Sequence, residues 1–371
     1  MALAMLLPLI ALFSASCGGV RKPEGWAPPA LSQDAALIFT AKERLSAFDF
    51  AGPAPILKWT FPNKDLSTQK DIKLEAVYDS PLRTTDAVYL ATYHGELFAL
   101  NPADGSIIWR RSDIKAGIVG GPVLAQGKYL VFGTIEGRLY VVEAASGKPA
   151  RMESDYQWPD NGVKVAGPVW AAPAIRGGGI YIATMTGDVV LYNIQGGPAR
   201  KLYHGTGAIA DLTLLDDAHL FVPSLNKTVT ILNPDDGAVI SSYRASDWVW
   251  SRPAFQSGIA YFGDFSGQVT ALDITTGQAK WTAAAGARIK AAPAIAGGAL
   301  VVADRKPAAH FFDLATGKLL NTVPILDAGT VRAAAVPSAN VVYILTTHGR
   351  LFRANPADLS LVEVPLNGTK P

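Results

Sequence analysis

A phrase that recurs at a nearly fixed interval is the feature that most constrains this fold. It reads "VTALDITTGQAKW" at 269–281 and "LFALNPADGSIIW" at 97–109, with a shorter form, "HFFDLATGKLL", at 310–320. The turn glycines of the aligned copies are Gly105, Gly147, Gly196, Gly237, Gly277 and Gly317, in steps of 42, 49, 41, 40 and 40 residues. Further copies at 45–61 and 351–364 give eight in total. A period of about 40 residues is typical of the blades of a β-propeller.

Each period contains the signals of four short strands. In the copy at 252–283 they are "RPAFQSG", "IAYFGD", "QVTALDI" and "QAKWTA", separated by Gly-containing turns. Val, Ile, Thr, Tyr and Phe fill these segments, and no helical period runs for ten residues without a Gly or Pro. The sequence predicts an all-β fold, an eight-bladed β-propeller of four-stranded antiparallel blades. Seven blades is the main alternative, because ring closure often mixes strands from the two ends of the chain.

Three tryptophans close the outer strand of their repeats. We expect each to pack over the turn glycine and over a small alanine of the adjacent strand, since a side chain of this size buries ~150–250 Å². The tryptophans are Trp59, Trp109 and Trp281, and the alanines are Ala47, Ala99 and Ala271. We interpret them as contacts between blades rather than as ligand-binding residues.

Composition excludes several classes of function. Hydrophobic residues make up 49% of the 371 residues and charged residues 17%, which is enough apolar material for a large core. The net charge is +2 and Lys and Arg form no run, so neither nucleic acid nor an acidic membrane surface is indicated as a partner. The single cysteine, Cys17, excludes an internal disulfide framework and all Cys-pair motifs for zinc, redox chemistry or haem.

The first residues predict secretion. "MALAMLLPLIALFSASCGG" is an apolar segment that ends in small residues before Cys17, and it resembles a bacterial lipoprotein signal. It departs from that pattern in having no Lys or Arg before the apolar segment and Ser14 where Leu is usual. We expect a signal peptide at 1–16, a lipid-anchored tether at 17–26 beginning with lipidated Cys17, and a single propeller domain at 27–371. The alternative is an ordinary cleaved signal with an incidental cysteine.

The repeat also resembles a known family. "AAPAIRGGGIYIATMTGDVVLYN", "SRPAFQSGIAYFGDFSGQVTALDITTGQAKW" and "TTDAVYLATYHGELFALNPADGSIIW" are similar to the repeat of the PQQ-repeat (quinoprotein-like) propellers. The resemblance covers nearly the whole mature chain and is specific for the fold, because the repeated residues serve packing and turns. One branch, the PQQ-dependent dehydrogenases, is longer and binds calcium beside the quinone, in many cases with a vicinal Cys pair. This chain has no such pair.

The other branch, the BamB lipoproteins of the outer-membrane assembly machinery, is similar in length and layout. That resemblance implies a non-catalytic cell-envelope scaffold without a cofactor. It would be anchored at Cys17 to the outer membrane, facing the periplasm, and its propeller face would dock on envelope proteins during outer-membrane protein assembly. The alternatives are a PQQ-dependent dehydrogenase-like enzyme and a glycan-binding propeller that uses exposed tryptophans as stacking platforms.

Long connections between repeats are the expected partner-binding elements, because loops tolerate insertion and carry binding groups. The longest are 62–80, 148–171 and 244–252. Since Trp, Tyr and Arg are enriched in interface anchors, the candidate partner-binding residues are Tyr156, Trp158, Asp160, Trp248 and Arg252. We expect Tyr156 and Trp158 to be at least partly exposed, on the same face as Trp248. The alternative for Trp158 and Trp248 is that they fill the channel mouth, and for Trp170 and Trp250 packing is favoured.

No catalytic or metal-binding set emerges from the pattern. His94 and His348 occupy equivalent His-Gly turns and are interpreted as solvated turn residues. The acidic turn "NPDDG" at 233–237 lacks the bidentate Glu of a calcium loop and is expected to form an Asx-type turn.

Overall fold

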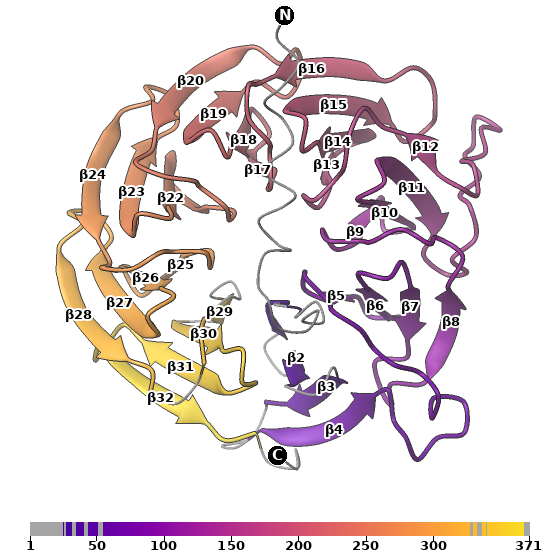
Figure 1. Cartoon of the computed structure of the whole chain (residues 1–371), viewed down its shortest axis with the longest axis horizontal. Helices are drawn as coiled ribbons and strands as arrows, with labels where there is room; N and C mark the ends of the chain where they lie inside the picture. The colour runs from indigo at the N-terminus through magenta and orange to yellow at the C-terminus, as the bar shows by residue number, and fades with distance from the viewer. Residues whose placement is uncertain are drawn as a thin grey trace, which may run out of the picture.

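A computed structural model describes Gly25 and residues 27–31, 35–40, 44–50, 55–326, 329–331, 336–338 and 340–366. Thirty-two strands form eight four-stranded sheets, which are arranged as a ring of blades (Figure 1). Within the described residues no helix is long and apolar enough to cross a membrane. Cys17 and the expected signal peptide lie outside the described residues.

The blades are numbered in chain order. The first blade contains β1 (Ala30–Leu31), β2 (Ala35–Thr40), β3 (Arg44–Asp49) and β4 (Ile56–Phe61), and the second contains β5 (Leu82–Arg83), β6 (Val88–Ala91), β7 (Leu97–Leu100) and β8 (Ile107–Arg111). The third blade contains β9 (Val123–Ala125), β10 (Tyr129–Gly133), β11 (Arg138–Glu143) and β12 (Val163–Lys164), and the fourth contains β13 (Ala174–Arg176), β14 (Gly179–Ala183), β15 (Asp188–Asn193) and β16 (Arg200–His204). The fifth blade contains β17 (Thr213–Asp216), β18 (His219–Pro223), β19 (Thr228–Leu232) and β20 (Val239–Arg244), and the sixth contains β21 (Ala254–Gln256), β22 (Ile259–Gly263), β23 (Gln268–Asp273) and β24 (Ala279–Ala284). The seventh blade contains β25 (Ala294–Ala296), β26 (Ala299–Ala303), β27 (Ala308–Asp313) and β28 (Leu319–Pro324), and the eighth contains β29 (Val336–Ser338), β30 (Val341–Leu345), β31 (Leu351–Asn355) and β32 (Ser360–Val364).

Within the described residues every sheet is built from four consecutive antiparallel strands, and none combines strands from the two ends of the chain. The prediction of an all-β propeller is confirmed, and the eight sheets fit the eight-bladed prediction better than the seven-bladed alternative. The middle strands β10, β14, β18, β22 and β26 are almost wholly buried. Their runs of Val, Ile, Leu, Phe and Tyr suit a strand that is covered on both faces by neighbouring blades.

The hydrophobic core of the described residues is divided into eight clusters, and each lies between neighbouring blades. Between the third and fourth blades, for example, Val131 packs in the same cluster as Ile182. The last cluster joins Phe48 on β3 to Leu345 and Leu351 of the eighth blade. Among the described residues, this packing joins the eighth blade to the first and closes the ring.

The predicted tryptophan contacts between blades are confirmed. Trp59, on β4, pairs in register with Ala47 and lies over Gly105 of the second blade, where an added Cβ would come 2.6 Å from the indole. Its indole N–H donates to the carbonyl oxygen of Pro102 at 3.0 Å. Trp109 and Trp281 repeat the alanine pairing, the glycine contact and the indole hydrogen bond to the next blade.

Candidate functional site

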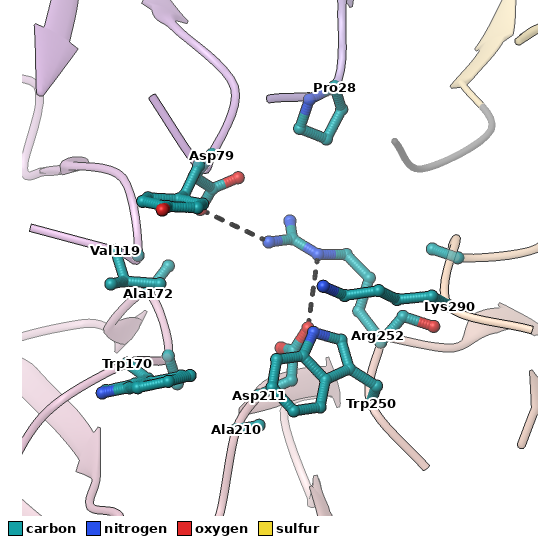
Figure 2. A pocket seen from close by; sticks show the side chains of 15 residues that line it. Pro28, Asp79, Val119, Trp170, Ala172, Ala210, Asp211, Trp250, Arg252 and Lys290 are labelled. Atoms are coloured by element: carbon teal, nitrogen blue, oxygen red, sulfur yellow. Dashed lines mark ion pairs between the residues drawn. The ribbon is translucent and has the colours of Figure 1, made fainter. Parts of the chain in front are cut away.

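One end of the central channel is lined by the residues that precede the innermost strand in the second to seventh blades. The equivalent three-residue segments are 78–80, 119–121, 170–172, 210–212, 250–252 and 290–292. A repeated backbone hydrogen bond holds them in place: Phe265 N–H donates to Trp248 O at 3.0 Å, and Met185 N–H donates to Pro168 O at 2.8 Å. We call the space enclosed by these segments the channel recess (Figure 2).

Three of these segments, 119–121, 170–172 and 290–292, carry Gly or Ala at their second and third positions, because the backbones approach closely. A Cβ on Gly120 would lie 2.2 Å from the backbone nitrogen of Ala172. The other three segments depart from Gly and Ala at their second and third positions, and each of them places a charged group in the recess. The departures are Asp79, Ser80, Asp211, Leu212, Ser251 and Arg252. Residues that break a structural repeat are candidates for a functional role.

Arg252 lies between two carboxylates that come from different parts of the ring (Figure 2). Its Nη2 is 3.7 Å from Asp79 Oδ2, and its Nε is 3.8 Å from Asp211 Oδ2. Both distances are ion-pair distances but exceed that of a direct hydrogen bond. Although the recess encloses the guanidinium, 51% of the Arg252 side chain is accessible to solvent. The group is therefore charged, centrally placed and reachable.

The carboxylates are held by backbone donors. Ser80 N–H donates to Asp79 Oδ1 and Gly121 N–H donates to Asp79 Oδ2, each at 2.8 Å. Leu212 N–H donates to Asp211 Oδ1 at 2.7 Å. These bonds fix the orientation of both carboxylates towards Arg252 and leave further lone pairs on their oxygens.

The charges in the recess shift one another's ionisation. Burial raises the pKa of Asp211, the cation of Arg252 opposes that shift, and the nearby charge of Asp79 adds to it, with a net rise. Asp211 and Asp79 in turn hold the pKa of Arg252 above its usual value, against the effect of burial. The guanidinium therefore stays protonated at every pH at which the fold is stable.

Aromatic rings form one wall of the recess and continue onto the surface at its mouth. Trp170 and Trp250 meet edge to face with centroids 6.1 Å apart, and Trp250 stacks on Phe265 at 5.9 Å. Trp248 also contacts Phe265 at 5.9 Å. We call Trp170, Trp248, Trp250 and Phe265 the mouth cluster, and all of its members are partly exposed.

Two cations flank the mouth cluster. The Arg288 guanidinium lies 5.2 Å from the centroid of Phe265, and Lys290 Nζ lies 4.8 Å from that of Trp250. Cations over ring faces are attracted by the ring quadrupole. The mouth of the channel is therefore both aromatic and positively flanked.

The structure brings together Trp248 and Arg252, but not the other candidates with them. Tyr156, Trp158 and Asp160 belong to the connection between β11 and β12. That connection runs along the outer rim of the ring (Figure 1). The prediction that Tyr156 and Trp158 share a face with Trp248 is wrong. The physical reason is the short outer strand of the third blade, since β12 has only two residues and the preceding connection covers the blade in place of a longer strand.

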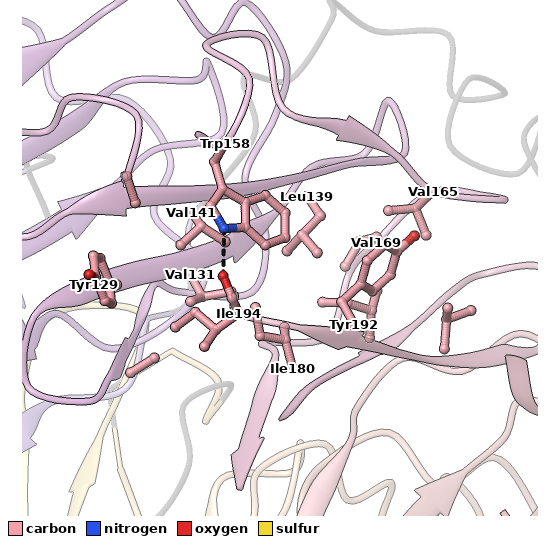
Figure 3. Packing of buried hydrophobic residues seen from close by; sticks show 14 of the residues in the cluster. Tyr129, Val131, Leu139, Val141, Trp158, Val165, Val169, Ile180, Tyr192 and Ile194 are labelled. Carbon is pink, nitrogen blue, oxygen red and sulfur yellow. Dashed lines mark hydrogen bonds between the residues drawn. The ribbon is translucent and has the colours of Figure 1, made fainter. Parts of the chain in front are cut away.

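Trp158 is 2% exposed, so the expectation of an exposed side chain is wrong (Figure 3). It packs among Val141, Ile180 and Tyr192 between the third and fourth blades, and its indole N–H donates to Ile194 O at 2.9 Å. Tyr156 is half-buried and lies over Gly196, as the tryptophans of other blades lie over their turn glycines. The extra residues therefore supply the aromatic contact between these two blades.

Asp160 fastens the same connection to the second blade. Its Oδ1 accepts from Nη2 of Arg111 at 3.0 Å, and Arg111 is only 9% exposed. Arg111 also binds Asp113 and donates to the carbonyl oxygen of Gly147 at 3.2 Å. Asp160 is thus part of an ion-pair network that holds the outer rim.

Sequence reasoning missed Asp79, Asp211 and Ser251. A signal was present: where other segments read Ala-Ala-Pro or Gly-Gly-Pro, the chain has Asp-Ser-Pro at 79–81, Asp-Leu-Thr at 211–213 and Ser-Arg-Pro at 251–253. Trp250, for which packing was favoured, packs on Phe265 and also lines the recess.

Other polar groups have structural partners. His310, which is buried, bonds Asp304 and its cross-strand neighbour Thr322, each at 3.0 Å, while Thr322 lies exposed on the outer strand β28. His94 is exposed and pairs with Glu75. No group of three or more His, Cys, Asp and Glu side chains suited to a metal ion occurs in the described part of the chain.

Comparison with solved structures places the fold. The chain is similar to the crystal structure of BamB from Moraxella catarrhalis, with a TM-score of 0.68 at 14% identity, over 90% of this chain and 97% of that one. It is also similar to the C-terminal WD40 domain of Sif2, with a TM-score of 0.70 at 13% identity, over 92% of this chain and 95% of that one. These likenesses establish a propeller fold.

Comparison of sequences identifies the family. The chain is 22% identical over 336 residues to the outer membrane protein assembly factor BamB of Burkholderia pseudomallei (strain K96243), covering 75% of this chain and 84% of the relative. It is 26% identical over 345 residues to the protein of that name from Legionella pneumophila (strain Paris), covering 79% and 86%. The family profile described as "Outer membrane protein assembly factor BamB" matches residues 16–243 and 225–362. The chain belongs to this family of PQQ-repeat propellers.

Proposed function

We propose that this protein is a non-catalytic scaffold of outer-membrane protein assembly, which docks on an envelope partner through the mouth cluster. The curated relatives are described as outer-membrane assembly factors, which supports the general role. The observation that carries the docking surface is the set of four partly exposed aromatic rings gathered at one end of the channel. Aromatic residues of this kind often supply most of the energy of an interface.

The chemistry of the mouth defines the partner surface. Trp248 and Phe265 present apolar area, while Arg288 and Lys290 lie against the rings of Phe265 and Trp250. A complementary surface would offer apolar side chains to the rings and carboxylates to the flanking cations. We therefore propose that the partner segment is apolar with acidic neighbours.

An anchor at Cys17 would constrain the orientation of this surface. Gly25 packs against the backbone of Val77, and Ala27 N–H donates to Val77 O at 3.2 Å, directly beside the recess residues Tyr78 and Asp79. Eight residue steps separate Cys17 from Gly25, and a chain of that length spans at most about 29 Å when fully extended. Lipidation of Cys17 would therefore hold the channel mouth close to the membrane surface.

The docking proposal is tested by capture of the envelope partner from solubilised membranes. Trp248→Ala combined with Phe265→Ala is expected to weaken capture by about tenfold or more, because two anchors are lost. Val239→Ala is the matched control, since Val239 is an exposed apolar residue on the outer strand β20. Equal capture by the double variant and the control would contradict docking at the mouth.

The anchor is tested separately. Mass spectrometry of the mature protein is expected to find a lipid-modified Cys17 as the first residue, and Cys17→Ser is expected to release the protein from membranes. An unmodified amino terminus in the membrane fraction would contradict the anchor without affecting the docking surface.

A further inference from the structure

The channel recess contains a buried polar group without a partner. Ser251 is 9% exposed, lines the recess, and its Oγ makes no hydrogen bond within the described part of the chain. A buried hydroxyl in this state costs free energy, so its retention calls for a ligand or another compensating group. The neighbouring Asp79 and Asp211 carboxylates, by contrast, accept hydrogen bonds from the backbone. The missing hydrogen bond is therefore that of the Ser251 hydroxyl.

The adjacent guanidinium is accessible to solvent and could donate to a ligand in the recess. Arg252 carries five N–H donors. No hydrogen bond joins them to the described residues, and its ion pairs measure 3.7 and 3.8 Å. A ligand oxygen placed between Arg252 and either carboxylate could accept from the guanidinium and, as a hydroxyl, donate to the carboxylate. Such a bridging group must be both a donor and an acceptor.

The charge balance of the recess argues against an ionic ligand. Asp79 and Asp211 contribute two formal negative charges, and Arg252 and Lys290 contribute two positive charges. A bound anion would face the two carboxylates, and a bound cation would face the two basic groups, at a cost in either case. A neutral ligand with many hydroxyl groups is repelled neither by the carboxylates nor by the basic groups.

The walls of the recess indicate the shape of that ligand. Trp170 and Trp250 line the recess with flat apolar rings whose planes meet at 73° (Figure 2). One ring of a sugar can pack its C–H face on an indole while its hydroxyl groups reach polar side chains.

We propose that the channel recess binds a neutral saccharide of one or two rings. The sugar ring packs on Trp250, its hydroxyl groups bridge Arg252 to Asp79 and Asp211, and one of them meets the buried Oγ of Ser251. Trp250 belongs to the mouth cluster as well, whereas Ser251 and the two carboxylates lie inside the recess and outside that cluster. Ser251→Ala therefore tests sugar binding without altering the proposed docking surface.

The test uses the complete mature protein with defined sugars. Saturation-transfer NMR and calorimetric titration would be carried out with maltose, cellobiose and N,N′-diacetylchitobiose, each up to ~10 mM, a range suited to weak single-site binding. Glucuronate and glucosamine are the anionic and cationic probes. The variants are Ser251→Ala and Trp250→Ala, with Ser246→Ala as the matched control, because Ser246 is exposed on the same connection and bonds Gln268 instead of the recess.

At least one neutral disaccharide is expected to bind. Ser251→Ala should weaken its affinity by about fivefold through the lost hydrogen bond, Trp250→Ala should abolish binding, and Ser246→Ala should have no effect. The proposal is overturned if no neutral sugar binds, if glucuronate or glucosamine binds as tightly, or if Ser251→Ala binds like the control. Circular dichroism of Ser251→Ala would be recorded alongside, because a retained spectrum distinguishes weaker binding from unfolding.

Discussion

The indole N–H of Trp158 donates to the carbonyl oxygen of Ile194 at 2.9 Å across the boundary between the third and fourth blades. Trp59, Trp109 and Trp281 make the same type of bond to the blade that follows them. The bond recurs although Trp158 comes from a long connection and the other three come from regular outer strands. Contact between blades, rather than strand length, is therefore what the repeat preserves at this position.

We predict that Trp158→Ala lowers the free energy of unfolding by about 3–5 kcal/mol, because it empties a buried site and leaves Ile194 O without its donor. Urea unfolding measures the loss. Trp248→Ala, which removes a partly exposed ring, should cost less. A larger effect at Trp248 than at Trp158 would contradict the assignment of Trp158 to the core.

Gly105 and Gly127 allow two contributions to the cost of replacing a turn glycine by alanine to be separated, the backbone conformation and the steric contact of the added Cβ. Both have positive φ, +72° and +66°, but a Cβ on Gly105 would lie 2.6 Å from Trp59, whereas nothing lies within 4 Å of one on Gly127. Gly127→Ala should cost about 1–2 kcal/mol from the backbone conformation alone. Gly105→Ala should cost about 1 kcal/mol or more beyond that, because the indole must move. Equal unfolding midpoints for the two variants would show that the Trp59 contact is loose.

Asp188 gives the fold a dependence on acid pH. It is 4% exposed, and its Oδ1 binds Lys201 Nζ at 2.7 Å and His204 Nδ1 at 2.9 Å. Burial raises the pKa of Asp188, but the bonds from Lys201 and His204 outweigh burial and lower it overall. Its contribution is therefore present above the unfolded value of about 3.9 and is lost as the pH falls through the lower folded value.

Asp188→Asn is accordingly expected to reduce stability at neutral pH and to make less difference as the pH falls below about 4. Unfolding free energies measured across that range test the sign. Asp236→Asn, at an exposed turn, serves as the control. A stability difference that grows on acidification would contradict the lowered pKa.

The repeat was sufficient to predict the eight blades, their order and the pairing of Trp59, Trp109 and Trp281 with small alanines. Each of these depends on residues close together in one period. The position of Trp158 could not be predicted in this way. An aromatic residue in a long connection has the same local sequence whether it turns inward or outward, and the shortening of β12 that draws it inward is a property of the whole blade.

The recess was hidden for a related reason. Asp79 and Arg252 come from connections on different sides of the ring, and only closure of the eight blades brings them within 3.7 Å. Arg252 is a candidate from sequence because arginine is common in interfaces and Trp248 lies close by in the chain. The carboxylates of Asp79 and Asp211 are indicated only by their replacement of the Ala-Ala-Pro pattern of other segments. Local sequence therefore identified one member of the ion-pair set and not its geometry.

Photo-crosslinking in intact cells tests docking at the channel mouth most directly. A benzophenone amino acid would replace Phe265 in the mouth cluster or, as the control, Val239 on the outer strand β20. We predict one discrete adduct from position 265, identified by mass spectrometry as a component of the outer-membrane assembly machinery and lost when Trp248→Ala is added, with no such adduct from position 239. The same adduct from position 239, or none from position 265, would contradict the account.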